Sequence, residues 1–226
     1  MFFYDYYSIV IMLPLFLISL IIQLNLKSTY SRYKRINNSR NMSGSQIARL
    51  ILNSAGIYDV SIECVSGNLT DHFDPVNKVV RLSNEVYNGN SIAAIGIAAH
   101  EVGHAIQHNI GYLPVKIRSS VIGVTNFSSK ILYLLIVLSF ATHIPVLCDV
   151  AVICFLIIFL FQVITLPVEF NASARALKYI KGISFADSDI RGVRKVLSSA
   201  AMTYVAAMLV SFGQMLTFIL RFSKRR

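Results

Sequence analysis

The sequence predicts a mainly α-helical, polytopic membrane protein with about four transmembrane helices and a small α+β portion that contains a short β-hairpin. Of its 226 residues, 55% are hydrophobic and only 14% are charged, which excludes a polar disordered chain and an ordinary soluble enzyme. Several apolar runs approach the roughly 20 residues that a helix needs to cross a bilayer. Between the first and second runs, helix-like and strand-like patterns follow one another, and this segment is the expected α+β portion.

The chain has a net charge of +10, from 21 Lys and Arg residues against 11 Asp and Glu residues. In a membrane protein such an excess ordinarily sets the topology and contacts anionic headgroups. We therefore expect a lipid bilayer, and not nucleic acid, as the partner. The three cysteines, Cys64, Cys148 and Cys154, show no CxxC spacing and indicate no disulfide framework.

The first transmembrane helix is expected at residues 7–26, within an uncleaved N-terminal anchor of residues 1–26. The run is rich in Ile and Leu and contains no charged residue. A signal peptide begins with basic residues, whereas Asp5 is the only charge before this run. Five basic residues follow within twenty positions, so the positive-inside rule places segment 27–116 in the cytoplasm and the N-terminus outside.

Segment 27–116 begins with a short helix and a pair of strands. The helix is expected to be capped by Ser43 or Ser45 and to end at Gly56. Alternating apolar residues then predict a strand at 60–64, and Lys78–Leu82 predicts a second one. We expect the two strands to form a hairpin that leaves an exposed edge.

A transmembrane hairpin is expected in 117–168. Residues 131–168 are almost wholly apolar apart from a break at residues 142–149, and the first span must take in residues before Ile131 to reach full length, which places Lys130 deep in it. Residues 169–198 form a more polar helical segment on the cytoplasmic side. A fourth transmembrane helix is expected in 199–226, which ends in a basic tail. Four crossings return this tail to the outer side, whereas its charge favours the inner side. The last segment is therefore either a re-entrant or interfacial helix or a full span with an outer tail.

A longer helix, expected from Ser91 to His108, contains the sequence His100-Glu101-Val102-Gly103-His104. Imidazoles four residues apart share one face of a helix and can bind one zinc ion, with Glu101 beside the metal-bound water. Zinc lowers the pKa of this water to about 7, so that the carboxylate can take its proton and an amide bond is hydrolysed. The pattern therefore predicts one Zn²⁺ ion and a hydrolase.

A hydrolytic zinc site has three protein ligands and one open position. Glu169 is the favoured third ligand, because a carboxylate beside a membrane span needs a partner; it could instead reach the interface or pair with Arg175. His108 lies too far along a straight helix to share the ion. His72 could serve as the third ligand, although a histidine beside two aspartates in a turn is as often a structural residue of the loop. Ser173, one turn after the glutamate, could orient a ligand.

Several further blocks accompany the HExxH sequence. They are LTDHFDP (69–75), VRLS (80–83), SIAA (91–94), AAHEVGHAIQ (98–107), LPVEFNAS (166–173) and TYVAA (203–207). Through these blocks the chain resembles the YugP-type neutral zinc metallopeptidases, membrane-embedded enzymes of bacteria, from about residue 44 to residue 207. It departs from the family pattern at Asn171, where an aspartate is more frequent, and at Phe73, where a tyrosine is common.

The resemblance implies a zinc-dependent endopeptidase in which His100 and His104 bind the metal and Glu101 acts as the base. Similarity to the wider group of membrane zinc peptidases supports Glu169 as the third ligand and a zincin-like fold for segment 27–116. The implied location is the bacterial inner (plasma) membrane, with the catalytic side in the cytoplasm. We expect membrane or membrane-proximal polypeptides as substrates, bound as extended chains along the exposed edge of the strand Lys78–Leu82.

A non-hydrolytic, zinc-binding membrane scaffold is the alternative function. A structural zinc site has a fourth protein ligand and needs no base, so Glu101 distinguishes the two possibilities. Peptide hydrolysis also needs a donor for the developing oxyanion, and Tyr204, Arg175 and His108 are candidates that the sequence does not rank. The oligomeric state is not indicated by the sequence.

Overall fold

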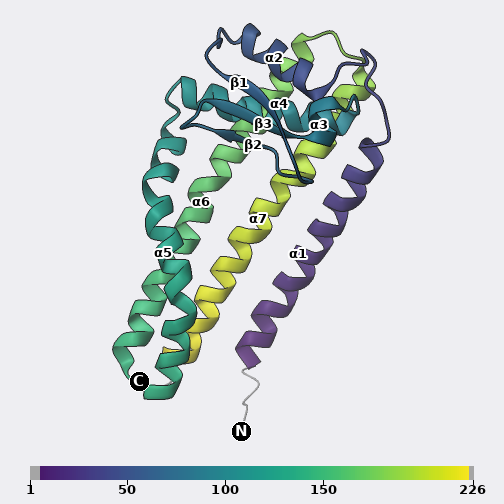
Figure 1. Cartoon of the computed structure of the whole chain (residues 1–226). Helices are drawn as coiled ribbons and strands as arrows, with labels where there is room; N and C mark the ends of the chain where they lie inside the picture. Colours follow the sequence, from purple (N-terminus) through teal and green to yellow (C-terminus); the bar gives the residue numbers. More distant parts are fainter. Residues whose placement is uncertain (1–5, 224–226) are drawn as a thin grey trace. The chain divides into compact units, whose positions relative to one another are not determined.

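The computed structural model describes residues 6–223 (Figure 1), which form two compact units. Within the described residues, one unit comprises 6–23, 116–167 and 202–223, and the other comprises 24–115 and 168–201. In chain order the elements are α1 (Tyr6–Tyr33), α2 (Gly44–Ser54), β1 (Ser61–Val65), β2 (His72–Asp74), β3 (Val79–Ser83), α3 (Asn84–Asn88), α4 (Ile92–Asn109), α5 (Leu113–Thr142), α6 (Pro145–Gly182) and α7 (Asp187–Ser223). The predicted fold class, mainly helical with a small α+β portion, is confirmed.

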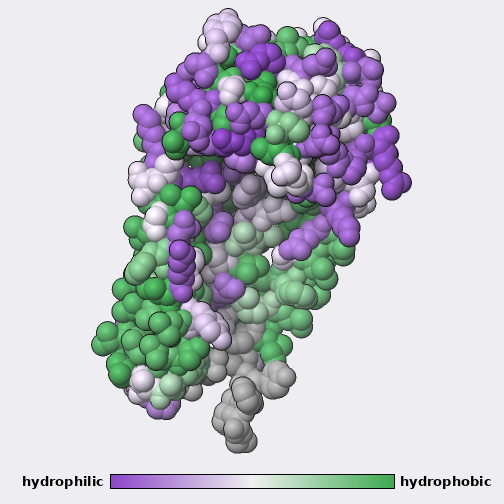
Figure 2. All heavy atoms as spheres, viewed as in Figure 1, coloured by the Kyte–Doolittle hydropathy of each residue, from purple (hydrophilic) through white to green (hydrophobic). Residues whose placement is uncertain are grey.

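Four helices, α1, α5, α6 and α7, are long and apolar enough to cross a membrane, which confirms the expected number. Figure 2 shows hydrophobic side chains covering these helices. The break in the predicted hairpin lies between Thr142 and Pro145, where His143 has a positive φ of 55°. Helix α1 continues to Tyr33, past the expected end of the span.

Helix α6 neither breaks nor begins at Pro167. It runs from Pro145 to Gly182, so Glu169 lies inside a continuous helix. Membrane helices tolerate an internal proline where neighbouring groups satisfy the freed backbone. The polar stretch 169–198 is divided between the last turns of α6 and the first turns of α7, which are joined by a short connection.

The unit that comprises 6–23, 116–167 and 202–223 is called the apolar unit below. Its helices pack through aromatic pairs and a glycine. Phe155 and Phe218 have ring centroids 5.4 Å apart, and α6 and α7 contact one another again through Phe159 and Phe212. A Cβ atom at Gly213 would collide with the side chain of Leu15, so α1 approaches α7 closely at this level. Small residues allow such close packing between membrane helices.

Helix α2 begins and ends as predicted. Ser43 is the N-cap and accepts a hydrogen bond from the Gln46 backbone, while the Gln46 side chain accepts one from the Ser43 backbone in a capping box. Gly56 has a φ of 71° just after the helix, a conformation that glycine adopts without steric cost. The capping box and the glycine thus limit α2 to about three turns.

The sheet differs from the predicted hairpin. Its strand order is β1-β3-β2, with β1 parallel to β3 and β2 antiparallel to β3. The expected pairing of 60–64 with 78–82 as an antiparallel hairpin is therefore wrong, and so is the expected exposed edge at Lys78–Leu82. The hairpin is formed by β2 and β3, because the polar block around Asp74 supplies a short strand and a turn that alternation does not reveal.

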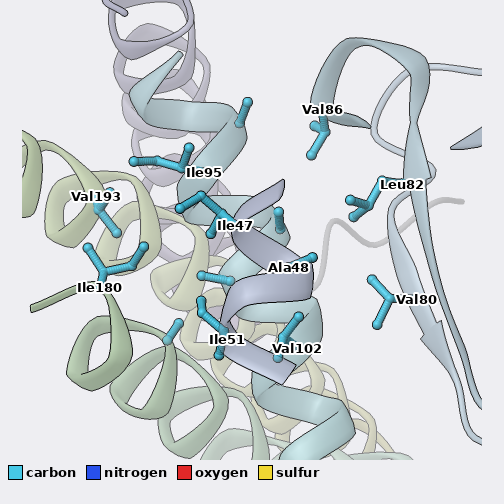
Figure 3. Close-up of a cluster of buried hydrophobic side chains, with 14 of the residues drawn as sticks. Ile47, Ala48, Ile51, Val80, Leu82, Val86, Ile95, Val102, Ile180 and Val193 are labelled. Atoms are coloured by element: carbon cyan, nitrogen blue, oxygen red, sulfur yellow. The ribbon is translucent and has the colours of Figure 1, made fainter. Parts of the chain in front are cut away.

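The core of the second unit surrounds α2 and α4 (Figure 3). In the figure, side chains from the sheet and from α6 and α7 approach these helices from opposite sides. The labelled residues are Ile47, Ala48 and Ile51 from α2, Val80 and Leu82 from β3, Val86 from α3, Ile95 and Val102 from α4, Ile180 from α6 and Val193 from α7. Helix α4 is thus held by packing along most of its length.

Two aspartates hold the β2–β3 hairpin. The carboxylate of Asp71 accepts hydrogen bonds from the backbone and hydroxyl of Ser83, at 2.7 and 3.1 Å. Asp74 accepts one from the side chain of Asn77 at 2.7 Å and pairs with Arg81 at 2.5 Å. Both aspartates of the DHFDP block therefore contribute to the fold.

The Asp74→Asn substitution should destabilise the protein near neutral pH. Hydrogen bonds from Asn77 and Arg81 hold the pKa of Asp74 well below its ordinary value. A carboxyl whose folded-state pKa is depressed contributes stability above its unfolded pKa of about 3.9 and loses that contribution as the pH falls further. The thermal midpoint of the variant should thus lie below that of wild type at pH 7, and the difference should shrink below about pH 4.

The measurement is thermal unfolding of the detergent-solubilised chain in EDTA, so that metal release does not contribute. Asp59→Asn is the matched control, because Asp59 forms an ion pair with Lys78 that is largely exposed and should contribute little. A midpoint for Asp74→Asn that equals that of wild type at pH 7 contradicts the prediction.

Candidate metal centre

Helix α4 carries the HExxH sequence and begins as predicted. The hydroxyl of Ser91 accepts a hydrogen bond from the backbone of Ala94 at 3.1 Å, which caps the helix. Alanine and glycine occupy many of its buried positions, so neighbouring elements can approach the helix axis. The helix continues one residue past His108 to Asn109, and Gly111 follows with a φ of 64°.

Gly103, the second variable residue of the HExxH sequence, sets the distance between α4 and α6. A Cβ atom at this position would lie 2.5 Å from the carbonyl oxygen of Ala172 and 3.1 Å from its Cα atom. Backbone atoms cannot rotate away as a flexible side chain can, so any larger residue must push α6 outward. Glu169 lies three residues before Ala172 on α6, so the same contact brings its carboxylate close to α4.

The two histidines of the sequence and Glu169 converge. The Nε2 atom of His100 lies 3.3 Å from Oε2 of Glu169, and the Nε2 atom of His104 lies 3.6 Å from the same oxygen. All three ligand atoms lie within 4.8 Å of one another. The carboxylate is almost fully buried, whereas the imidazoles keep 17% and 18% of their side-chain surface exposed, so this group can be reached from one side.

This donor set fits zinc. Zinc binds imidazole nitrogen and carboxylate oxygen at about 2.0–2.2 Å in tetrahedral geometry, which places neighbouring ligand atoms about 3.4 Å apart. The two separations between imidazole and carboxylate, 3.3 and 3.6 Å, bracket this value. Two nitrogens and one oxygen are also the combination found in many catalytic zinc sites.

A buried amide orients His104. The Nε2 atom of Gln107 donates to the carbonyl of Val168 at 2.8 Å and to Oδ1 of Asn171 at 3.0 Å. The Oε1 atom of Gln107 is therefore the acceptor for the ring nitrogen Nδ1 of His104, at 3.0 Å. With its proton on Nδ1, His104 presents the free electron pair of Nε2 to a metal. Arg175 completes the network by donating to Asn171 at 2.7 Å.

Ser173 contacts the other imidazole. Its hydroxyl lies 3.2 Å from Nδ1 of His100, the contact expected of a residue that orients a ligand. Burial disfavours the charged form of His104, but the hydrogen bond to Glu169 and the charges of Glu101 and Glu169 outweigh it and raise the pKa of His104. A cation bound between these groups would be stabilised by the same negative charges.

The other candidate residues lie outside this group of three. The exposed side chain of His72 contacts the carbonyl of Thr70, at 2.8 Å, and His108 packs its ring against Phe73, with centroids 5.8 Å apart. Neither belongs to the converging group. Arg175 bonds to Asn171 and lies over the ring of Tyr112, so the expected alternative of an ion pair with Glu169 is not formed. Tyr204 belongs to the other compact unit.

Sequence reasoning missed Gln107 and the part that Asn171 plays. The sequence spacing could have indicated the contact between Gln107 and His104, because Gln107 follows His104 by three residues and shares its helical face. Its full burial and its partners on α6 depend on how the two helices pack. Asn171 suits this place since its carbonyl oxygen accepts from two donors.

Comparisons with known proteins agree with the geometry. The model of the family described as "Putative neutral zinc metallopeptidase" matches residues 8–223. The chain belongs to this family. The curated "Putative membrane protease YugP" of Bacillus subtilis (strain 168) is 44% identical over 205 residues, which cover 90% of this chain and 91% of that protein. No solved structure shows a significant match to the chain.

Family membership confirms the expected class of protein and its cofactor. This membrane zinc peptidase is a protease by family, its cofactor is zinc, and its four apolar helices make it a membrane protein. The ligand atoms of His100, His104 and Glu169 lie close enough to one another to hold a metal ion, as such an enzyme needs.

The Gly103→Ala substitution should lower the zinc content. The added Cβ atom would push α6, and with it Glu169, away from the imidazoles, and overpacking of this kind costs about 1–3 kcal/mol. Metal analysis of the purified chain and its thermal midpoint measure the two effects. Gly96→Ala on the same helix is the matched control, because its Cβ atom meets Val193 at an ordinary 3.5 Å. Equal zinc content in both variants and wild type contradicts the proposed role of Gly103.

The Gln107→Leu substitution should weaken zinc binding about 10- to 100-fold, as is typical for partners of metal-binding histidines. Leucine fills a similar volume but cannot accept a hydrogen bond from Nδ1 of His104. Competition with a zinc chelator measures the affinity, and unfolding of the metal-free chain shows whether the substitution has also damaged the fold. An unchanged affinity shows that His104 needs no orienting amide.

Proposed function

We propose that this membrane zinc peptidase is an endopeptidase that cleaves membrane or membrane-proximal polypeptides. In this proposal His100, His104 and Glu169 bind one zinc ion, and Glu101 is the general base. The observation that carries it is the convergence of the two Nε2 atoms and the buried carboxylate on one point, from two helices far apart in the sequence.

The number of ligands favours a catalytic site over a scaffold. Structural zinc sites have four protein ligands, whereas hydrolytic sites have three and keep one position for water or substrate. Among the described residues, no fourth His, Cys, Asp or Glu joins the group of three. The partly exposed imidazoles leave room for a substrate on their open side.

In the proposed mechanism, His100, His104 and Glu169 would hold the zinc ion, which would supply a polarised scissile carbonyl and a coordinated water with a pKa lowered to about 7. Glu101 is half-buried and lies close enough for its charge to act on His104. Its carboxylate takes a proton from the attacking water and gives it to the amine that leaves, so that one peptide and one water yield an acid and an amine. Gln107 and Ser173 keep the imidazoles oriented throughout.

The free edge of β2 is the proposed binding site for an extended substrate. β2 is an outer strand of the sheet and packs against α4, with Phe73 in contact with His108. A peptide that adds to such an edge is held by its main chain, which gives loose sequence selectivity. An open edge binds the middle of a chain as well as its end, which supports an endopeptidase.

Chain connectivity and charge support a membrane-proximal site on the cytoplasmic side of the bacterial plasma membrane. Glu169 lies on the same continuous helix, α6, whose earlier turns are apolar enough to cross a bilayer. Basic residues follow α1 and occupy the end of α6, and positive residues favour the cytoplasm.

Substitution of the proposed site residues should separate catalysis from metal binding. Glu101→Gln should retain zinc and lose about 10²- to 10⁴-fold in cleavage rate, since it removes only the base. His104→Ala and Glu169→Ala should lose most of their zinc, because two remaining ligands bind it weakly. Cleavage of labelled casein and of a labelled membrane protein by the full chain, together with its zinc content, measures these effects.

His72→Ala and His108→Ala are matched controls for zinc content, because both side chains lie outside the converging group. Retention of zinc by Glu169→Ala rejects that ligand, and equal cleavage by wild type and Glu101→Gln rejects the base. A wild type that holds zinc and cleaves none of several substrates indicates the scaffold.

A further inference from the structure

Helix α5 has a polar face within its apolar sequence. Residues on this face are spaced alternately three and four positions apart, the spacing that keeps side chains on one side of a helix. They are Lys116, Ser119, Gly123, Asn126, Lys130 and Tyr133, and all six are exposed. Figure 2 shows hydrophilic atoms among the hydrophobic side chains of the helical part. The six residues are called the α5 polar face below.

Lys130 lies deep in this candidate span. It is twelve residues from the end of α5 at Thr142, or about 18 Å, and fourteen residues from Lys116, or about 21 Å. The hydrocarbon core of a bilayer is about 30 Å thick, so a flexible lysine side chain at this position reaches neither headgroup layer easily. A charge at such depth is costly unless it meets a polar partner.

Among residues 6–223, Lys130 of the α5 polar face has no such partner. Lys130 forms no hydrogen bond or ion pair with any described residue, and a Cβ atom at Gly123 would meet open space. The described carboxylate of the apolar unit, Asp149, lies four residues into α6, close to the loop and far from the depth of Lys130. The described residues therefore supply no polar partner for Lys130 at this depth.

We propose that the α5 polar face binds a transmembrane helix of a polypeptide substrate that carries a carboxylate near the middle of the bilayer. This inference rests on the proposed peptidase function. The positive charge of Lys130 complements a carboxylate, and Asn126 and Ser119 offer hydrogen bonds to polar groups of the same helix. Gly123 and Ser119 are small enough to let another helix approach closely.

The other occupants fit less well. A second copy of α5 would bring two Lys130 charges together, and like charges repel. Lipid tails offer no polar group, and anionic headgroups remain at the surface. The alternating spacing of the face suits a partner helix that crosses α5 at a small angle, as most membrane helix pairs do.

The test measures binding without cleavage. The full-length Glu101→Gln chain, labelled with a fluorescence donor, is placed in phosphatidylcholine vesicles with an acceptor-labelled polyleucine peptide of about 21 residues. One peptide carries a central glutamate and the other a central leucine. Energy transfer should show about 5- to 30-fold tighter association with the glutamate peptide, as expected for a polar contact between membrane helices.

Variants of α5 give the specificity. Lys130→Met should reduce association to the level of the leucine peptide, whereas Lys130→Arg should keep it. Val124→Met, at an exposed apolar position outside the polar face, is the matched control and should bind like the parent chain. Equal binding of both peptides, or no effect of Lys130→Met, overturns the proposal.

Two further results also overturn it. If labelled copies of the chain show energy transfer to one another, and Lys130→Met abolishes it, a second copy occupies this face. Rapid reaction of the Asn126→Cys variant with a membrane-impermeant thiol reagent, unchanged by the glutamate peptide, indicates a water-filled groove. Casein cleavage by the chain with Glu101 intact is measured separately, so failure of the peptidase function and failure of this docking site are told apart.

Discussion

The backbone contact between α4 and α6 is the constraint on which the metal centre depends. At Gly103 the carbonyl of Ala172 occupies the space in which any other residue would hold its Cβ atom. This approach brings Glu169 to within 3.3 and 3.6 Å of the two imidazoles. The HExxH pattern alone supplies the two proposed histidine ligands and the proposed base, and the proposed third ligand lies beside them because these helices touch.

The rest of the second unit holds this contact in place. Helix α4 lies in a core to which α2, the sheet, α6 and α7 all contribute apolar side chains. The sheet is held in turn by Asp71 and Asp74, whose hydrogen bonds tie β2 to β3 and to the start of α3. Sequence blocks that accompany the HExxH pattern thus have physical roles in the fold that positions it.

Helix α6 combines two functions that usually belong to separate elements. Its earlier turns are apolar enough to cross a bilayer, and its later turns carry Glu169, Asn171 and Ser173 toward α4. The helix continues through Pro167, so the proposed third ligand lies on the same helix as a candidate membrane span. This continuity accords with the proposed action on polypeptides at the membrane.

The sequence by itself determined the features that depend on neighbours within one or two helical turns. Four apolar runs predict four candidate spans, Ser43 and Ser91 predict two helix starts, and the HExxH spacing places two imidazoles on one face. The choice of Glu169 also came from the sequence, because a carboxylate beside a span needs a partner.

Tertiary structure alone decided the features that depend on pairing between distant segments. Strand order made β3 central and parallel to β1, and alternation in a single strand carries no information about its partners. The role of Gln107 likewise required α6 to pack against α4, since its partners Val168 and Asn171 lie more than 60 positions away. Local periodicity identifies a face, whereas packing selects what meets that face.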